Sequence, residues 1–532
     1  MTLHLDQLRP DRQLLASVAQ RALADRFDAA TLKLAPSFSA AVFDADGVVT
    51  WVGHGHQRRD AARPARGTVY RIASMSKSFL GAAALQARDA GLLDMHAPVT
   101  EYVPEFASAT YAGQPAHVTL EMLMSNRGGL AEDNPWGDNH LGASRAQISA
   151  VLAAGLRLAL PPDTTYQYSN LGISLVGRAL ERVTGLPVEQ VITERVLHPL
   201  GLTQTTYDPP QHDVATGWRT FDEGATWAAE PFVGCGALGC IGALFSTVDD
   251  IAAWAGFLRS AFTADPAHED VLSAASRREM QRVHTVIPGI DERLSQRPLS
   301  AAGYGYGLVI EHHRRLGLTV QHSGGLPGFT SHMRWHVDSG VGVVVFGNSD
   351  AVSAAGVAID VHDRLLDELV LQPAQPSAAG RRGALAAQLR PWPETLSAAR
   401  RLDEIVQALA GSPDSTASIS DLADVYAPNM LTDAPAAVRD QRIHAAAAAL
   451  GGTVADVADF ADRVIDAPTA ACLRWRVPAR HGWLICDVRL VGLSTPLVQA
   501  FSVSPTGKGD DADQTKPANE PVCVTDRFAA TL

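Results

Sequence analysis

The 532-residue sequence has no long apolar run, no surplus of basic residues and almost no lysine. No stretch approaches the roughly eighteen unbroken apolar residues that a membrane-spanning helix needs. Acidic residues outnumber basic ones by 57 to 44, which gives a formal charge of −13. Nucleic acids and anionic membrane surfaces both attract basic proteins, so this balance predicts neither of them as a partner.

Cysteine is also scarce, with five residues at positions 235, 240, 472, 486 and 523. Their odd number and their spacing predict neither a metal site nor a disulfide framework, and we expect no cofactor. A disulfide between Cys235 and Cys240 is one alternative, but in a reducing compartment both are expected to be small buried residues. Acidic and arginine residues interrupt residues 1–27 too often for a signal peptide, so the sequence predicts a cytoplasmic protein.

Arginine supplies nearly all of the positive charge of this chain. Only four of the 44 basic residues are lysine, at positions 33, 77, 508 and 516. Lys77 is therefore the one lysine between residues 36 and 507. A solitary lysine in an arginine-rich chain is a candidate for chemistry that needs a neutral amine, because a guanidinium does not lose its proton in proteins.

The length exceeds what one hydrophobic core usually serves, so we expect two domains. The first is predicted over 1–370, followed by a proline- and alanine-rich linker over 371–395. A small α+β domain is predicted over 396–505, and a disordered tail over 506–532.

The first domain is predicted to be α+β, because strands at both ends flank a helical middle, so one antiparallel sheet should join the two chain ends. Its expected helices are 12–26, one from Ser74 to Gly91, 120–124, 171–184 and 355–370. Its expected strands are an Asp-Gly hairpin over 38–55 and runs at 304–313, 318–325, 329–337 and 341–349. In the second domain, we expect helices at 397–410 and 435–449 and strands at 455–466, 470–477, 482–490 and 497–503.

Ser74 and Lys77 stand in the segment Ser-Met-Ser-Lys, at the start of an apolar helix. Residues three apart share a helix face, so the hydroxyl and the amine can meet. A desolvated lysine can take the proton of a serine hydroxyl and make the oxygen nucleophilic. Taken alone, such a pair is more often an ordinary surface serine and lysine, because so short a motif has a high false-positive risk.

A second polar cluster is Tyr168-Ser169-Asn170. Alternate residues of an extended turn project to one side, so Tyr168 and Asn170 are expected to face one way and Ser169 another. A phenol can relay a proton, and a carboxamide can hold a substrate amide or the lysine amine. Tyr166 is a competing tyrosine, but no asparagine stands two residues after it. A turn-forming asparagine beside a packed tyrosine is the alternative interpretation.

The third cluster is His322-Ser323-Gly324-Gly325, at the end of a predicted strand. Glycines allow a substrate to approach a strand edge closely. The backbone N–H groups near Gly325 and at Ser74 are candidates for an oxyanion hole. His322 is expected at the mouth of the pocket, as a donor or a titrating group. A glycine-rich hairpin turn is the alternative.

The order of these motifs resembles the class C β-lactamase-like family of penicillin-recognising serine hydrolases. S-x-x-K at 74–77, Y-x-N at 168–170 and H-x-G at 322–324 follow one another as they do in that family. Three further segments add to the resemblance, which covers about residues 35–370: GLLDMHAPVTEYVPEF, GCIGALFSTVDDIAAW and YGYGLVI. The resemblance implies an α/β lobe and an all-α lobe with the site between them, and catalysis through an acyl-enzyme.

Two departures from the family pattern bear on the substrate. His322 stands where β-lactamases carry the lysine of a K-T-G motif, and H-x-G is typical of D-aminopeptidases, some esterases and related amidases. The segment MSNRGGL at 124–130 stands where many relatives carry a Thr-Ser-Gly-Leu-like turn. It places Asn126 and Arg127 near the pocket, as substrate contacts or as a plain turn.

The sequence thus predicts a serine hydrolase acting on a small ester or an amide or peptide, D-configured residues included. Ser74 is the predicted nucleophile, Lys77 the base and Tyr168 the proton relay. The predicted contacts to substrate or oxyanion are Asn170, His322, Ser323, Gly325 and Asn126. Two alternatives are an acyl-transfer peptide cyclase of the penicillin-binding-protein type and a non-catalytic binding protein of the same fold. The expected partner is a small-molecule or peptide substrate, and the oligomeric state stays open.

Overall fold

The computed structural model describes residues 9–56, 63–211, 213–220, 222, 224–288, 299–313, 316–371, 391–412, 414–427, 430–431, 434–454, 457–491 and 496–507. The chain divides into two compact units, Met1–Gln372 and Pro373–Leu532. Most of the predicted linker and tail lies outside the described residues. The described end of the predicted linker includes the start of α14, at Pro393. The described start of the predicted tail is the end of β18, which runs to Gly507.

Unit 1 is built around an eight-stranded antiparallel sheet with the order β2-β1-β14-β13-β12-β11-β10-β9. Because β1 lies between β2 and β14, the two ends of the unit meet in one sheet, as the sequence predicts. The strands of this sheet are β1 (Ser37–Asp44), β2 (Gly47–Gly55), β9 (Thr285–Val286), β10 (Leu299–Tyr304), β11 (Val309–His313), β12 (Gly317–Leu326), β13 (Phe329–His336) and β14 (Gly342–Gly347).

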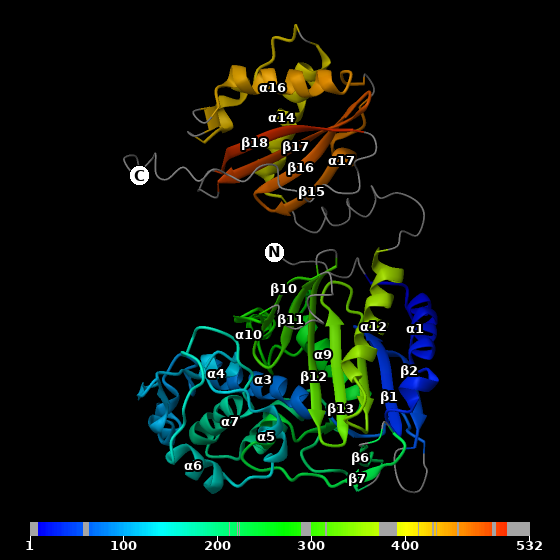
Figure 1. Cartoon of the computed structure of the whole chain (residues 1–532). Helices are drawn as coiled ribbons and strands as arrows, with labels where there is room; N and C mark the ends of the chain where they lie inside the picture. The colour runs from blue at the N-terminus through cyan, green and yellow to red at the C-terminus, as the bar shows by residue number, and fades with distance from the viewer. Residues whose placement is uncertain are drawn as a thin grey trace. The chain divides into compact units, whose positions relative to one another are not determined.

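Alternation along β1 divides the hydrophobic core between the two faces of the sheet. Phe38, Ala40 and Val42 pack with α1 (Arg12–Arg26) and α12 (Ala354–Leu366) on one face. Ala41 and Phe43 belong to the larger core on the opposite face, which includes α9 (Val248–Ser260). Figure 1 shows α1 and α12 lying side by side along the sheet. This period-two division makes β1 a strand buried on both faces.

The remaining helices lie mainly in a helical lobe between β3 (Tyr70–Arg71) and β8 (Phe245–Ser246), two short strands that pair with each other. The 3₁₀ turns η2 (Ala73–Met75) and η6 (Gly239–Ile241) border this lobe. Its helices are α3 (Ser76–Asp89), η3 (Val99–Glu101), η4 (Pro104–Ser108), α4 (Leu120–Met124), α5 (Asn134–Asn139), α6 (Arg145–Ala153), α7 (Asn170–Thr184), α8 (Val188–Ile192) and the π-helix η5 (Thr193–Leu197). The other elements of the unit are α2 (Ala29–Leu32), α10 (Ala274–Met280), the π-helix η7 (Asp367–Leu371), β4 (Thr110–Tyr111), β5 (Gln114–Pro115), β6 (Gly217–Arg219) and β7 (Ala228–Glu230).

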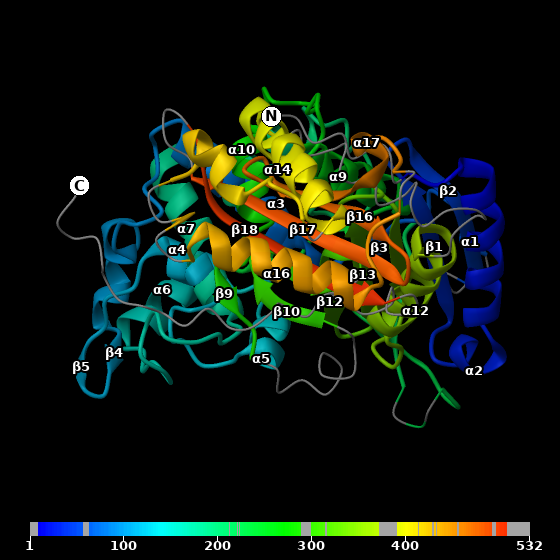
Figure 2. The same cartoon turned by 90° about the horizontal axis from the view of Figure 1, so that it is seen from above.

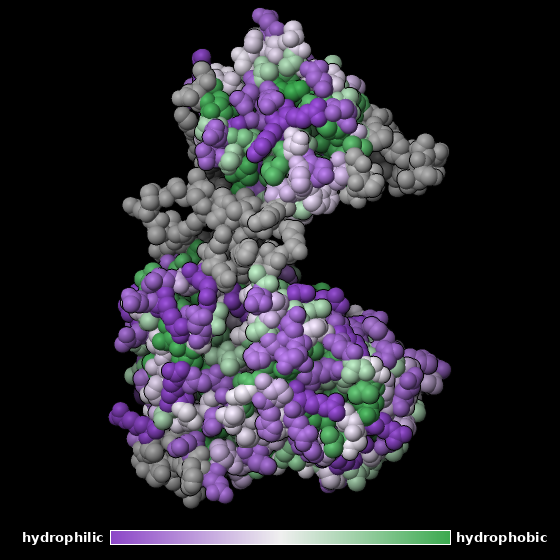
Figure 3. Space-filling view, turned by 180° about the vertical axis from the view of Figure 1, so that it is seen from behind, coloured by the Kyte–Doolittle hydropathy of each residue, from purple (hydrophilic) through white to green (hydrophobic). Residues whose placement is uncertain are grey.

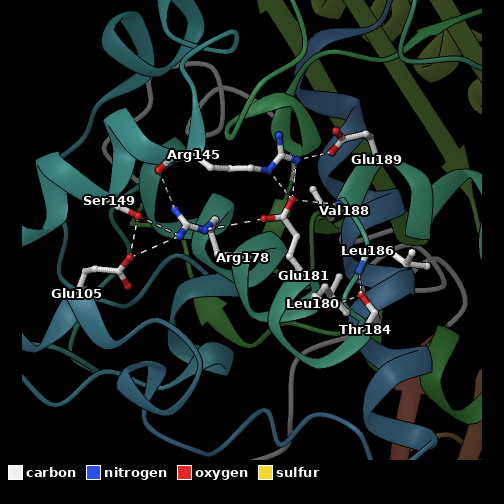
Figure 4. Close-up of polar contacts among 10 residues, drawn as sticks. All are labelled: Glu105, Arg145, Ser149, Arg178, Leu180, Glu181, Thr184, Leu186, Val188 and Glu189. Carbon is white, nitrogen blue, oxygen red and sulfur yellow. Dashed lines mark hydrogen bonds and ion pairs between the residues drawn. The ribbon is translucent and has the colours of Figure 1, made fainter.

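An ion-pair network ties the outer helices of the lobe together (Figure 4). Arg145 at the start of α6 contacts Glu189 of α8 at 2.8 Å and also pairs with Glu181 of α7. Arg178 of α7 lies 3.6 Å from Glu105 of η4. Single exposed ion pairs contribute little to stability, but several charges on four elements hold one arrangement of the lobe.

Unit 2 is a four-stranded antiparallel meander covered by helices. Its strands are β15 (Val464–Thr469), β16 (Cys472–Ala479), β17 (Gly482–Val491) and β18 (Leu497–Gly507), in that order. Its helices are α14 (Pro393–Gly411), η8 (Ile419–Val425), α16 (Ala436–Ala449) and α17 (Phe460–Arg463). Figures 1 and 2 show α14 and α16 on the same face of this sheet, where Leu473, Trp475 and Val477 are buried.

Two predicted strands differ from the structure. The run at 455–466 contains α17 and only the start of β15, because its apolar residues Val457, Phe460 and Val464 are spaced by three and four and not by two. The run at 304–313 holds the end of β10, a turn and all of β11. Gly307 lies in this turn with φ +70°, and a Cβ there would come within 2.3 Å of the Lys77 carbonyl oxygen.

The described surface of unit 1 mixes hydrophilic residues with small hydrophobic patches on the face seen in Figure 3. Among the described helices, none combines the length and apolarity that crossing a bilayer requires. Four cysteines in the described part of the chain are free thiols: Cys235, Cys240, Cys472 and Cys486. The alternative of a Cys235–Cys240 disulfide is therefore wrong.

Candidate active site

A strained turn presents Ser74. The preceding residue, Ala73, has φ +49°, which is unusual for a residue other than glycine and costs about 1 to 3 kcal/mol. Ser74 follows within η2, and α3 begins two residues later at Ser76. The Ser76 hydroxyl donates to the Ala73 carbonyl at 2.6 Å and helps to hold the turn. Such strain is found mainly at functional sites, where the surrounding structure maintains it.

β12 packs directly against this turn. A Cβ at Gly324 would lie 2.2 Å from the Ile72 carbonyl oxygen and 3.0 Å from the Ala73 Cβ, so only glycine allows the approach. Ser331 of β13 supports the same place, because its hydroxyl donates to the Ile72 carbonyl at 2.7 Å. The third motif and the first are therefore adjacent in space.

Lys77 is completely buried and lies at hydrogen-bond distance from Ser74. Its Nζ is 2.7 Å from Ser74 Oγ and donates to the Ile241 carbonyl at 3.0 Å. Among the described residues, no carboxylate forms an ion pair with it. Burial lowers the pKa of Lys77 to about 7, although the charges of Asp138 and Asp133 oppose this shift. A substantial fraction of the amine is thus neutral near pH 7 and can accept a proton.

Tyr168 lies on the same side of the site. Lys77 Nζ stands 5.1 Å from the centre of its ring, and its phenol is hydrogen-bonded to Ser74. Burial raises the pKa of Tyr168 well above the ordinary value, so the phenol keeps its proton. Both tyrosines pack on Tyr304, with ring centres 5.9 Å apart for Tyr166 and 6.2 Å apart for Tyr168.

The residues after Tyr168 begin α7. Ser169 caps the helix by accepting from the Gly172 N–H at 2.9 Å, so its hydroxyl is committed to the start of α7. Asn170 is buried and donates through Nδ2 to Asn134 Oδ1 at 3.1 Å and to Asp138 Oδ1 at 3.4 Å. The structure therefore gives Asn170 acidic and amide neighbours that the motif alone does not reveal.

Asn126 supports this region from the turn after α4. It has φ +59°, and its Oδ1 accepts from the Ser169 N–H at 3.0 Å. Arg127 forms an ion pair with Glu121 and hydrogen-bonds to Asp163 at 2.5 Å. The guanidinium is thus committed to the protein, which favours the plain-turn interpretation of Arg127 over a substrate contact.

His322 differs from expectation. It was predicted at the pocket mouth, but it is only 4% exposed. Its Nε2 lies 3.0 Å from the Tyr304 hydroxyl and its Nδ1 2.5 Å from the Ser323 carbonyl oxygen. Burial, with a smaller effect of Lys77, lowers the pKa of His322 to about 3. The imidazole is therefore neutral at physiological pH and does not titrate there.

The end of β12 offers an open edge beside the nucleophile. β13 pairs with β12 from Thr319 to Leu326, whereas β11 pairs with it only from Gly317 to Gln321. Ser323 and Gly325 are exposed, and a Cβ at Gly325 would meet nothing within 4 Å. The Ser323 hydroxyl is 2.8 Å from His332 Nδ1. The backbone of this part of β12 is therefore unpaired on one side and can accept an extended substrate.

Several neighbours of the site were not predicted from the sequence. Tyr304 was noted only within a glycine-rich segment, yet its hydroxyl orients His322. Asp133 accepts from the N–H groups of Asn170 and Leu171 at 2.6 and 2.9 Å and so caps α7, and Asp138 lies beside it on α5. The density of polar residues in AEDNPWGDN at 131–139 was the available signal.

Comparison with known proteins places this arrangement in a family. The family model "Beta-lactamase" matches residues 25–366. D-alanyl-D-alanine-carboxypeptidase/endopeptidase AmpH of Escherichia coli K12 is 27% identical over 292 residues, which are 53% of this chain and 71% of AmpH.

Two solved structures have the same fold. The octameric penicillin-binding protein homologue from Pyrococcus abyssi is 17% identical with a TM-score of 0.56, covering 93% of this chain and 99% of its own. A D-stereospecific amidohydrolase from Streptomyces sp. is 19% identical with a TM-score of 0.51, covering 68% of this chain and all of its own. These two structures show the same fold, an antiparallel sheet flanked by helices. The family model, which matches more than half of the chain, shows that the chain belongs to the beta-lactamase family of serine hydrolases.

Proposed function

We propose that this protein hydrolyses a small ester or an amide or peptide, D-configured residues included, through an acyl-enzyme on Ser74. The observation that carries the proposal is Lys77: a buried amine, without an ion-pair partner among the described residues, 2.7 Å from the Ser74 hydroxyl. The names of AmpH and of the Streptomyces amidohydrolase support an amide or peptide substrate.

The first half of the reaction forms the acyl-enzyme. Neutral Lys77 takes the proton of Ser74 while Oγ bonds to the substrate carbonyl carbon. The negative charge on the carbonyl oxygen is held by the backbone N–H groups of Ser74 and Gly325. As the intermediate collapses, the bond to the leaving group breaks and that group receives a proton from Lys77 through the Tyr168 phenol.

Water completes the cycle. It gives a proton to the same relay, its oxygen attacks the acyl carbon, and Ser74 Oγ leaves and regains its proton. Because the pKa of Tyr168 is raised, it acts as a neutral relay and not as a phenolate base. His322 is a neutral imidazole at neutral pH and has no imidazolium proton to give, so we assign it to holding Tyr304 and the end of β12, in place of the titrating role predicted from the sequence.

The test compares wild type with Ser74→Ala on p-nitrophenyl acetate and D-alanine p-nitroanilide. We expect turnover of at least one substrate by wild type and none above background by the variant. Added amine acceptors distinguish hydrolysis from acyl transfer, because transfer gives an amide product. Full activity of the alanine variant would exclude the proposed mechanism.

A further inference from the structure

The short helix α5 brings a carboxylate to the candidate site. α5 contacts α7, which begins with Asn170, and β12, the strand that carries the open edge. Its Gly137 allows this approach, because a Cβ there would come within 2.5 Å of the Asn170 Cβ. Asp138 follows Gly137, and its carboxylate accepts from Asn170 Nδ2 at 3.4 Å. Asp138 takes no part in the proposed acyl-enzyme reaction.

Asp138 and Asp133 differ in how far their hydrogen-bonding capacity is used. Asp133 accepts from two backbone N–H groups and from the Ser169 hydroxyl, at 2.6 to 3.1 Å, so its oxygens are committed to the start of α7. For the Asp138 carboxylate, the Asn170 amide is the one hydrogen-bond donor within the described chain. Asp138 is half-buried and therefore has acceptor capacity left at a place that a substrate can reach.

A second acceptor next to it is also unused. Asn170 is fully buried, and among the residues that the structure describes its Oδ1 has no hydrogen-bond partner. The Nδ2 of the same carboxamide contacts Asn134 and Asp138, so the group lies among these acceptors. Buried polar atoms are rarely left without a partner in the functional state, which indicates a donor supplied by a ligand.

The charges around these two acceptors favour a cation. The negative charges of Asp133 and Glu132 act on the Asp138 carboxylate, and the opposing positive charge is that of Lys77. Burial raises the pKa of Asp138 to about 6, so its carboxylate is mainly ionised at pH 7, whereas Lys77 with a pKa of about 7 is only partly charged. A group with several N–H donors and a positive charge matches this environment.

We propose that Asp138 and the Oδ1 of Asn170 bind an ammonium group on the acyl part of the substrate. This rests on the proposed function and narrows it: the substrates are aminoacyl esters, amides or peptides with a free amine close to the reacting carbonyl. Substrates whose amine is blocked or absent bind more weakly.

The test is a ratio of two matched probes at pH 7. p-Nitrophenyl 2-aminobutyrate, in both configurations, is compared with p-nitrophenyl butyrate, each corrected for spontaneous hydrolysis. We expect wild type to favour the amine-bearing ester in kcat/KM. Asp138→Asn should reduce this preference by about tenfold or more, mainly through KM, because the amide loses the charge-assisted hydrogen bond to the ammonium group.

Two controls separate the contact from general effects. Asp138→Glu keeps a carboxylate and should retain part of the preference. Glu101→Gln removes one charge at an exposed residue of η3 and should leave the ratio unchanged. Equal loss on both esters in Asp138→Asn, or a wild-type preference for butyrate, would overturn the inference.

Covalent labelling distinguishes this inference from the proposed function. Diphenyl 1-aminopropylphosphonate and diphenyl propylphosphonate both modify an activated serine, and only the first carries an amine. Faster labelling of Ser74 by the aminophosphonate, lost in Asp138→Asn, supports the inference. Equal labelling by both probes overturns the inference and leaves the proposed function intact. Absence of any labelling or turnover overturns both.

Discussion

Two buried basic side chains, Arg463 in unit 2 and Lys77 in unit 1, have opposite kinds of partner. In unit 2, Arg463 donates to Asp403 at 2.7 Å, and Trp475 donates to the same carboxylate at 2.8 Å. In unit 1, Lys77 is buried as deeply but has no ion-pair partner among the described residues, and its contacts are a hydroxyl and a carbonyl. The paired arginine stabilises its unit, whereas the unpaired lysine has a lowered pKa and a proton-accepting amine.

The largest effect is expected from exchanging lysine and arginine at these two buried positions. Lys77→Arg keeps the positive charge but removes the neutral form, so kcat/KM should fall by about a thousandfold or more. Arg463→Lys is the matched exchange in unit 2 and should leave kcat/KM unchanged. Steady-state kinetics on the best ester substrate measure both. Retained activity in Lys77→Arg would mean that Lys77 is not the base.

The second prediction removes the partner of Arg463. Asp403→Asn leaves a buried guanidinium without its counter-charge, so the free energy of unfolding of unit 2 should fall by about 3 to 5 kcal/mol. Asp424→Asn, which breaks the exposed pair with Arg401, is the control and should change little. Denaturant unfolding followed by tryptophan fluorescence measures both. Similar effects of the two substitutions would contradict a stabilising role for the buried pair.

The third prediction concerns the cost of burying Lys77. The folded protein lowers the lysine pKa from 10.5 to about 7, so burial is unfavourable while the amine is charged. The penalty is complete below about pH 7 and disappears as the pH rises toward 10.5. Lys77→Met should therefore raise the free energy of unfolding, on the order of 2 kcal/mol at pH 6, while abolishing activity.

Unfolding midpoints of wild type and Lys77→Met across pH 6 to 10 check this prediction. The difference between them should shrink with rising pH, because the wild-type penalty is relieved. A gain that does not vary with pH would indicate improved packing by methionine and not relief from a buried charge.

The smallest predicted effect extends the comparison to two neighbouring glycines. Gly324 is committed to packing against the Ser74 turn, whereas Gly325 faces open space. Gly324→Ala should lower the free energy of unfolding by about 1 to 3 kcal/mol, because the backbone must shift. Gly325→Ala should leave it nearly unchanged. Equal losses in thermal unfolding would show that the two positions are packed alike.

The sequence predicts most of the elements because their apolar periodicity is strong. The helix at 12–26 and the helix at 120–124 have the predicted bounds, and the hairpin around Gly47 forms as expected. The run at 455–466 fails because short apolar stretches with mixed spacing do not distinguish a turn of helix from a strand.

The environment of the site is less predictable than its motifs. The structure brings Ser74, Lys77 and Tyr168 together. The residue types of their motifs and the order of these motifs along the chain were what predicted the site. The burial of His322 depends on Tyr304 and on the packing of three strands, which no local pattern encodes. Asp138 acquires its place only when α5 packs against α7, so its relation to Asn170 follows from tertiary structure.

The most direct test of the account is to locate the acyl group. Wild-type protein turning over p-nitrophenyl acetate is quenched with acid, digested and mapped by mass spectrometry. We predict an acetyl group on the peptide that contains Ser74, present at high occupancy in wild type and absent in Ser74→Ala. Stoichiometric acetylation of another residue, with Ser74 unmodified during turnover, would contradict the account.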